Sequence, residues 1–150
     1  DELIDPKAEA LLYAADRAQH IAELVRPALQ RGEVVVQDRY IDSSLAYQGA
    51  GRVLEAGDVR HLSEWATDEL WPDLTVLLDL SPEEAVKRRA GRGEEDDRLE
   101  REAIEFHRAV REGFLRLATE HPERYLVLDA TTNPDTLAED IRARVSGLIS

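Results

Sequence analysis

The sequence predicts an α/β fold in which helices flank a parallel β-sheet. Three short apolar runs, at residues 34–36, 74–80 and 125–128, show no alternation of polar and apolar residues, as expected for strands covered on both faces. Segments with helical periodicity separate these runs, which is typical of parallel strands joined by right-handed crossovers. With 150 residues, 43% of them apolar, the chain suits one domain over residues 1–150.

The N-terminal segment predicts a long helix that begins at Asp5 and Pro6 and ends at Gly32. Its apolar residues recur at alternating spacings of four and three, so we expect this seam to pack against another element. The seam consists of Leu11, Ala15, Ala18, Ala22, Val25 and Leu29. Tyr13 and Arg17, one turn apart, share a different face. This pair is either a solvated face or a place where a ring stacks on a base and a guanidinium donates to its carbonyl.

Five further helices are expected between and after the strands. They begin near Ser43, Asp58, Pro82, Leu99 and Asp135. We expect Gly49 and Gly51 to interrupt the first of them, and a Ser-Pro-Glu-Glu capping box at 81–84 to start the third. The residues expected to face inward on the last two helices include Phe106, Val110, Leu117, Leu137, Ile141, Val145 and Leu148.

Charge and composition narrow the class of partner. The net charge of −13, from 32 acidic against 19 basic residues, argues against a surface that binds nucleic acid through many phosphate contacts. The sequence has no cysteine and no histidines at metal-ligand spacing. No run approaches the roughly 20 apolar residues of a membrane span, and no signal-like segment opens the chain. We therefore expect a cytoplasmic protein with a small-molecule ligand and no membrane partner.

The segment from Asp38 to Gly49 directly follows the first apolar run. It places polar groups where a strand meets a helix, the usual position of a phosphorylated ligand in a parallel α/β sheet. Asp38 and Arg39 either pair with each other at the strand end or face a ligand cleft. The neighbouring ring, hydroxyl and amide groups favour a cleft that binds a nucleotide. They belong to Tyr40, Ser43, Ser44, Tyr47 and Gln48.

A second group of charges surrounds the glycine-hinged segment 91–97, which predicts a mobile loop. Its arginines are Arg88, Arg89, Arg92 and Arg98. A guanidinium at this position suits closure over a transferring phosphoryl group. The alternative is a charged surface loop in which these arginines pair with the acidic residues 94–97.

Taken in order, these segments resemble thymidylate kinase. The resemblance rests on residues 11–20, the Asp38-Arg39-Tyr40 corner with residues 43–44 and 46–49, the strand entry at 72–74, and residues 97–100. It implies a P-loop kinase-like parallel sheet flanked by helices. It also implies transfer of the ATP γ-phosphoryl group to thymidine monophosphate (dTMP), giving dTDP, with Mg²⁺ and usually in a homodimer.

The resemblance assigns roles at the acceptor site position by position. Tyr13 corresponds to the ring that stacks on thymine, and Arg17 to the donor to a thymine carbonyl. Arg39 corresponds to the clamp on the acceptor phosphate, and Asp38 to the carboxylate that orders magnesium and the phosphates. Tyr47 resembles the ring that crowds the sugar 2′ position. Ser44 and Gln48 fall where family members contact the base or sugar.

At the donor side the resemblance implies a lid at approximately residues 88–98. Arg92 corresponds to the lid arginine over the ATP phosphates, with Arg88 and Arg98 as helpers. Because a phosphate monoester with a second pKa of about 6 is already largely dianionic at neutral pH, the reaction needs no side-chain base. The expected catalytic residues are therefore Arg92, Asp38 and Arg39, which position groups and neutralise charge.

One element of the family pattern is absent from the sequence, namely the glycine-rich phosphate loop that ends in lysine and a hydroxyl residue. We expect the domain to be incomplete at its N-terminus, which leaves unpaired edges on the strands beside the missing one. Two hypotheses follow. The chain is either a piece of an active kinase, inactive alone, or a noncatalytic remnant that binds a pyrimidine nucleotide or dimerises through the helix seam.

Overall fold

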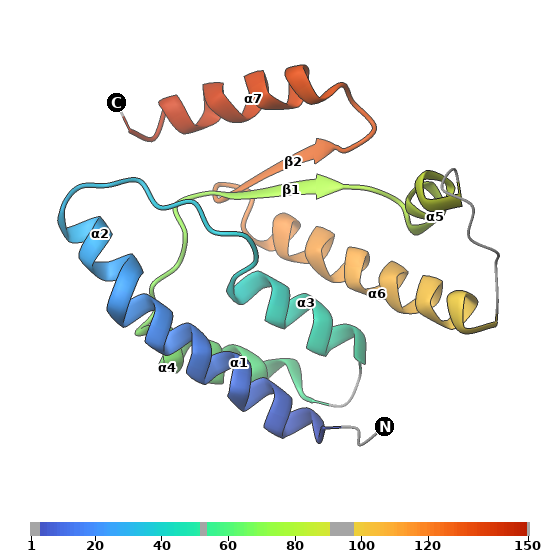
Figure 1. Cartoon of the computed structure of the whole chain (residues 1–150), viewed down its shortest axis with the longest axis horizontal. Coiled ribbons are helices and arrows are strands. Elements are labelled where there is room, and N and C mark those ends of the chain that lie inside the picture. The colour runs from blue at the N-terminus through green and yellow to red at the C-terminus, as the bar shows by residue number, and fades with distance from the viewer. Residues whose placement is uncertain (1–3, 52–53, 91–97, 150) are drawn as a thin grey trace. The chain divides into compact units, whose positions relative to one another are not determined.

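The computed structural model describes residues 4–51, 54–90 and 98–149, with the backbone alone described at 48–51, 89–90 and 98–103. The chain divides into two compact units, Asp1–Trp71 and Pro72–Ser150. Each unit is described by itself (Figure 1).

The first unit opens with one nearly continuous helical rod. It comprises α1 (Pro6–His20), a π-helical turn η1 (Ile21–Val25) and α2 (Arg26–Gln30). Asp5 caps the start as predicted, because its carboxylate accepts from the amide of Lys7 at 2.9 Å. The π turn ends two residues before Pro27, which has no amide hydrogen for the α-helical ladder. Gly32, with φ of 76°, lies just beyond the end of the rod, as expected.

The buried face of this rod differs from the predicted seam. The buried residues are Ala10, Ala14, Ile21, Val25 and Ala28. Leu11, Ala15, Ala22 and Leu29 are exposed, so only Val25 was correctly predicted to be fully buried. The small side chains of Ala10 and Ala14 allow α1 to pack closely on α4 (Ala56–Thr67), and the π turn shifts the helical period after residue 20.

Helix α3 (Ile41–Gly51) packs against α4, which also packs against α1. Ile41, Leu45 and Ala46 are buried on its inner face. The helix starts two residues before Ser43 and continues through Gly49, so the predicted interruption at that glycine is wrong. A glycine inside a helix costs only about 1 kcal/mol relative to alanine, which packing readily offsets.

The predicted strand at 34–36 is also wrong for the described chain. Residues 33–37 are extended, but they form no ladder with any described strand. Val34 is 62% exposed and Val36 is 93% exposed. An apolar run becomes a strand only when a partner supplies hydrogen bonds, and the sequence of the run does not contain that partner.

The second unit contains a two-stranded parallel sheet. Strand β1 (Thr75–Asp79) pairs with β2 (Tyr125–Asp129) in the register Thr75 to Tyr125 through Asp79 to Asp129. Helices α5 (Pro82–Ala90) and α6 (Arg98–Glu120) connect the strands, and α7 (Pro134–Ser146) follows them. Figure 1 shows α6 and α7 on opposite sides of the strands. The predicted α/β class with parallel strands and flanking helices is confirmed.

Local sequence signals predicted the positions of these helices correctly. They predicted which residues face inward only in part. Ser81 Oγ accepts from the Glu84 amide at 3.2 Å, which confirms the capping box. Val110 and Leu117 are buried as predicted, whereas Phe106 and Leu148 are exposed. The other three predicted inward residues of α7, Leu137, Ile141 and Val145, are half-buried. None of the helices that the structure describes has both the length and the apolar composition that crossing a bilayer requires.

Candidate active site

The candidate site in the first unit begins at the corner formed by residues 38–40, between the extended segment and α3. Arg39 has φ of 59°, a left-handed conformation that costs about 1–2 kcal/mol for a residue with a side chain. Its carbonyl accepts from Nε2 of Gln37 at 3.3 Å, and the Tyr40 carbonyl accepts from the Ser43 amide at 3.1 Å. The corner therefore leads directly into the first turn of α3.

The exposed Arg39 guanidinium lies over the ring of Tyr47, with Cζ 5.1 Å from the ring centroid. This is the geometry of a cation–π contact. Among the described residues, Arg39 forms no ion pair with the adjacent Asp38. The alternative in which these two charges neutralise each other is therefore not what the described residues show, and Arg39 remains accessible to an anion.

Arg17 reaches the same corner from α1. Its Nη2 donates to Ser44 Oγ at 3.0 Å and to the Tyr40 carbonyl at 3.4 Å, and its Cζ lies 5.5 Å from the centroid of the Tyr40 ring. Desolvation by burial lowers the pKa of Arg17 from its ordinary value, although an arginine stays protonated near neutral pH. The predicted alternative of a solvated helix face is thus wrong for Arg17.

Tyr13 lies one turn before Arg17 on α1 and is 53% exposed. Residues four apart on a helix are neighbours on its surface. The ring of Tyr13 makes no ring or hydrogen-bond contact with the other residues that the structure describes. Its face is thus accessible to a planar ligand beside the Arg17 guanidinium.

Asp38 is exposed at the corner, on the same turn as Arg39. In the described ranges no three histidine, cysteine or acidic side chains come together as a metal site would require. Mg²⁺ commonly keeps several waters and binds one or two carboxylates together with substrate phosphates. A single accessible carboxylate beside an arginine fits that mode of binding, in which the nucleotide supplies the other oxygen ligands.

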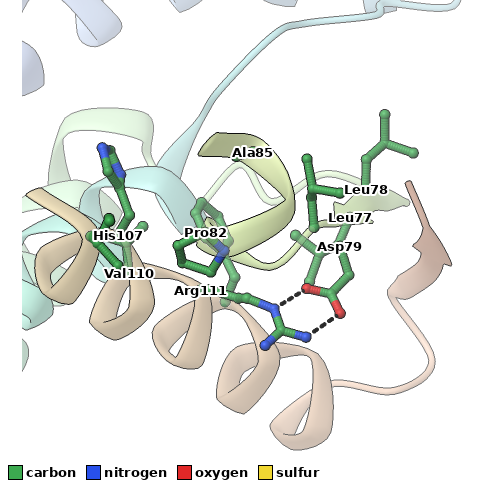
Figure 2. Close-up of a pocket in the computed structure, with 11 residues that line it drawn as sticks. Leu77, Leu78, Asp79, Pro82, Ala85, His107, Val110 and Arg111 are labelled. Atoms are coloured by element: carbon green, nitrogen blue, oxygen red, sulfur yellow. Dashed lines mark hydrogen bonds and ion pairs between the residues drawn. The ribbon is translucent and has the colours of Figure 1, made fainter. Parts of the chain in front are cut away.

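The second unit carries its own polar feature at the carboxyl end of β1. Asp79 accepts two hydrogen bonds from Arg111 of α6, with Nε to Oδ1 at 2.6 Å and Nη2 to Oδ2 at 2.7 Å. The pair lines a mostly apolar cavity of about 390 Å³. Figure 2 shows the pair beside Pro82 and Ala85, with His107 and Val110 also lining the cavity.

The predicted lid arginines lie at the edge of what the structure describes. Arg88 of α5 is exposed, and its Nη2 donates to the carbonyl of Ala130 at 2.8 Å, in the turn after β2. Arg92 lies outside the described residues, and the side chains of Arg98 and Gln48 are not described. The lid roles of Arg88, Arg92 and Arg98, and the base or sugar contact of Gln48, therefore stay predictions.

Comparison with known proteins decides the family. The family model of thymidylate kinase matches residues 1–141. This chain belongs to the thymidylate kinase family. Its resemblance to that family, inferred from the sequence, is thereby confirmed, and with it the P-loop kinase fold class and the assignment to the kinases, which are phosphotransferases.

Curated thymidylate kinases from several bacteria match almost the whole chain. The one from Leifsonia xyli subsp. xyli is 58% identical over 146 residues, which are 97% of this chain and 69% of that protein. The one from Clavibacter michiganensis subsp. michiganensis is 57% identical, covering 98% of this chain and 70% of that protein. The Deinococcus radiodurans enzyme is 54% identical over 95% of this chain and 69% of its own length.

Within this thymidylate kinase chain, the structure brings together five of the residues singled out at the acceptor site. They are Arg17, Arg39, Tyr40, Ser44 and Tyr47. The sequence analysis missed the Asp79–Arg111 pair. The available signal was that β1 and β2 both end in aspartate after an apolar run, which places two carboxylates at the carboxyl edge of a parallel sheet.

Proposed function

We propose that this chain supplies the acceptor site and the lid of a kinase that transfers the γ-phosphoryl group of ATP to dTMP, giving dTDP and ADP. The observation that carries the proposal is the convergence of Arg17 with Ser44 and Tyr40, residues 27 and 23 positions apart in the sequence. Such a long-range polar contact at the corner that leads into α3 suits a nucleotide site. Membership of the thymidylate kinase family indicates which nucleotide.

The contacts of Arg17 and Arg39 support an acceptor site in which one end binds the base of the nucleotide and the other end binds its phosphate. Arg17 contacts Ser44, and Arg39 lies on Tyr47, three residues further along α3. Residues three apart on a helix are neighbours on one face, so α3 holds the two guanidinium groups at different points along the same side. We assign Arg17 and Tyr13 to thymine, Arg39 to the 5′-phosphate, and Tyr47 to the sugar.

In the proposed reaction an oxygen of the dTMP phosphate attacks the γ-phosphorus of ATP. The new P–O bond forms as the bond from that phosphorus to the β,γ-bridging oxygen breaks, and ADP leaves with that electron pair. Arg39 binds and orients the acceptor dianion, which needs no further deprotonation. Asp38 would hold Mg²⁺ together with the phosphates, and the bound ion would neutralise charge on the phosphate oxygens.

The donor side of the proposal rests on the lid. We assign Arg92 to the ATP phosphates, with Arg88 and Arg98 beside it, because the transferring group carries charge that a guanidinium offsets. The printed sequence contains no glycine-rich phosphate loop. We therefore propose that a longer polypeptide supplies this loop, and that the 150 residues alone bind dTMP without appreciable turnover.

Calorimetric titration of the chain with dTMP and with deoxycytidine monophosphate tests the acceptor site. We expect dTMP to bind more tightly, because thymine presents a carbonyl to the Arg17 donors where cytosine presents an amino group. Equal affinity for the two nucleotides, or no binding of either, would contradict the assignment. Turnover is then measured in a coupled nucleoside diphosphate assay, where robust activity of the 150-residue chain would overturn the proposed need for a phosphate loop.

A second function, dimerisation, is favoured by one feature of the first unit. Leu11 and Leu12 are exposed on α1, each with more than half of its surface accessible. Apolar side chains gathered on one element of an otherwise acidic protein are typical of an interaction surface. We propose that this face pairs with a second copy of the chain, which suits both the active kinase and a noncatalytic remnant.

A further inference from the structure

The ring of Tyr40 lies between the Arg17 guanidinium and the turn after α4, and this arrangement points to a role for a residue so far assigned none. We propose that Tyr40 is a positioning residue that sets the direction of the Arg17 guanidinium, and that the turn at residues 67–70 holds Tyr40 in place. The inference rests on the proposed function, since it concerns how that acceptor site recognises a base. It assigns Tyr40 no contact with the nucleotide.

Three contacts define the position of Arg17, and two of them come from Tyr40. The ring centroid is 5.5 Å from Arg17 Cζ, and the Tyr40 carbonyl accepts from Nη2 at 3.4 Å. The third contact is the hydrogen bond from the same Nη2 to Ser44 Oγ at 3.0 Å. No hydrogen bond within the described ranges engages Nη1 or Nε. The remaining N–H groups are therefore free to donate to a ligand while Nη2 fixes the plane.

Tyr40 is itself fixed from its far end. Its hydroxyl donates to the carbonyl of Leu70 at 2.9 Å. Desolvation by burial raises the pKa of this phenol above its ordinary value, so the hydroxyl remains a donor near neutral pH. A ring anchored at both its backbone and its hydroxyl has little rotational freedom, which makes it a firm platform for a cation.

The turn that receives this hydrogen bond is also held in place. Asp68 and Glu69 have φ of 47° and 54°, two successive left-handed residues. Nη2 of Arg26 donates to the Thr67 carbonyl at 2.9 Å and contacts the Asp68 carboxylate at 3.2 Å. Thr67 is completely buried. Backbone in this uncommon conformation persists only where surrounding contacts define it, so the carbonyl that anchors Tyr40 has a defined position.

These contacts predict a graded response to substitution. Tyr40→Phe keeps the ring and loses the anchor at Leu70, whereas Tyr40→Leu loses the ring and the anchor together. Because both substitutions act through Arg17, neither should change dTMP affinity in a variant that lacks the Arg17 guanidinium. We expect Tyr40→Leu to weaken dTMP binding about fivefold to tenfold and Tyr40→Phe about twofold to threefold.

The decisive measurement is a double-mutant cycle by calorimetry with dTMP on the chain, using Arg17→Ala as the background. We expect Tyr40→Leu to change affinity less than about twofold in that background. An equal loss in both backgrounds would overturn the inference, as would wild-type affinity in Tyr40→Leu. Circular dichroism checks folding, and if Tyr40→Leu fails to fold, the same comparison is made with Tyr40→Phe.

A ligand-free readout separates this inference from the proposed function. The NMR signal of the Arg17 Nε–H group senses the ring current of Tyr40 and should shift in Tyr40→Leu, with no shift in the matched variant Tyr47→Leu. Absence of dTMP binding by the wild-type chain would contradict the proposed function and leave the positioning role of Tyr40 unaffected. An Arg17 signal that is the same in the wild type and in Tyr40→Leu would contradict the positioning role, whatever the chain binds.

Discussion

Arg111 and Asp79, 32 residues apart, form a two-pronged ion pair that ties α6 to the carboxyl end of β1. The hydrogen bond that Arg111 donates to Asp79 raises the pKa of Arg111, in keeping with a charge-assisted contact. Both side chains are partly accessible, 36% for Arg111 and 22% for Asp79, so solvent screens part of the attraction.

Substituting Arg111 should destabilise the second unit. We expect Arg111→Ala to lower the free energy of unfolding by about 1–2 kcal/mol, and Arg111→Lys by less, because lysine keeps the charge without the planar fork. Urea denaturation provides the measurement. The control is the Asp79→Ala, Arg111→Ala double variant. If its loss of unfolding free energy equals the sum of the losses of the two single variants, the pair contributes no coupling.

Arg39 combines backbone strain with a proposed phosphate contact, and two substitutions separate these effects. Arg39→Gly relieves the left-handed conformation, so it should be about 1 kcal/mol more stable than Arg39→Ala. Both variants lose the guanidinium and should bind dTMP about 10- to 100-fold more weakly. Thermal unfolding and calorimetry test the two parts. Unchanged dTMP affinity in both variants would remove Arg39 from the site.

The raised pKa of Tyr40 predicts how stability depends on pH. A group whose folded pKa lies above its unfolded value contributes stability that is fully present below the unfolded pKa and is lost as pH rises through the folded pKa. The stability advantage of the wild type over Tyr40→Phe should therefore shrink from about pH 9 upward, since an unfolded tyrosine titrates near pH 10. Chemical denaturation at intervals from about pH 8 to about pH 11 tests this, and a constant difference over that range would contradict it.

Arg92 is predicted to act on the transition state. In the kinase that carries the phosphate loop, Arg92→Ala should lower kcat by at least tenfold with a smaller change in the KM for dTMP, because a lid arginine mainly offsets charge that develops during transfer. Steady-state kinetics with varied dTMP provides the measurement. A raised KM with unchanged kcat would instead place this residue in ground-state binding.

The exposed leucines of the rod predict a change in association state. Leu11→Glu places a charge on this face and should convert a dimer into a monomer at micromolar concentration, because an unpaired charge is costly in an apolar interface. Sedimentation velocity measures the change. Leu148→Glu, at an exposed leucine of the second unit, is the matched control and should leave the association state unaltered.

Features whose cause is local could be predicted from the sequence. Asp5 and Ser81 cap helices through residues two to three positions away, so their patterns were sufficient. The strands at 74–80 and 125–128 were predicted because their apolar runs pair with each other. The prediction of a strand at 34–36 was wrong because a strand depends on a distant partner, which the residues of the run themselves do not encode.

The candidate site shows the same division between local and distant information. Periodicity placed Tyr13 and Arg17 on one helix face, but only the resemblance to thymidylate kinase related that face to the corner at residues 38–40. The anchoring of Tyr40 by Leu70 is a contact between a side chain and a carbonyl 30 residues away. A backbone carbonyl acceptor cannot be recognised from the sequence, since every residue has one.

The π turn at Ile21–Val25 has a consequence for how this protein can change through evolution. A turn of this kind is equivalent to one residue inserted into an α-helix. Because the wide turn already accommodates the extra residue, deleting Glu23 would restore the regular helix and leave the residues on both sides in their present orientation. Arg26 would still face the α4 terminus, and Arg17, upstream of the deletion, would keep its position. Descendants can therefore lose or regain this residue without disturbing either the ligand-facing arginine or the support of the site.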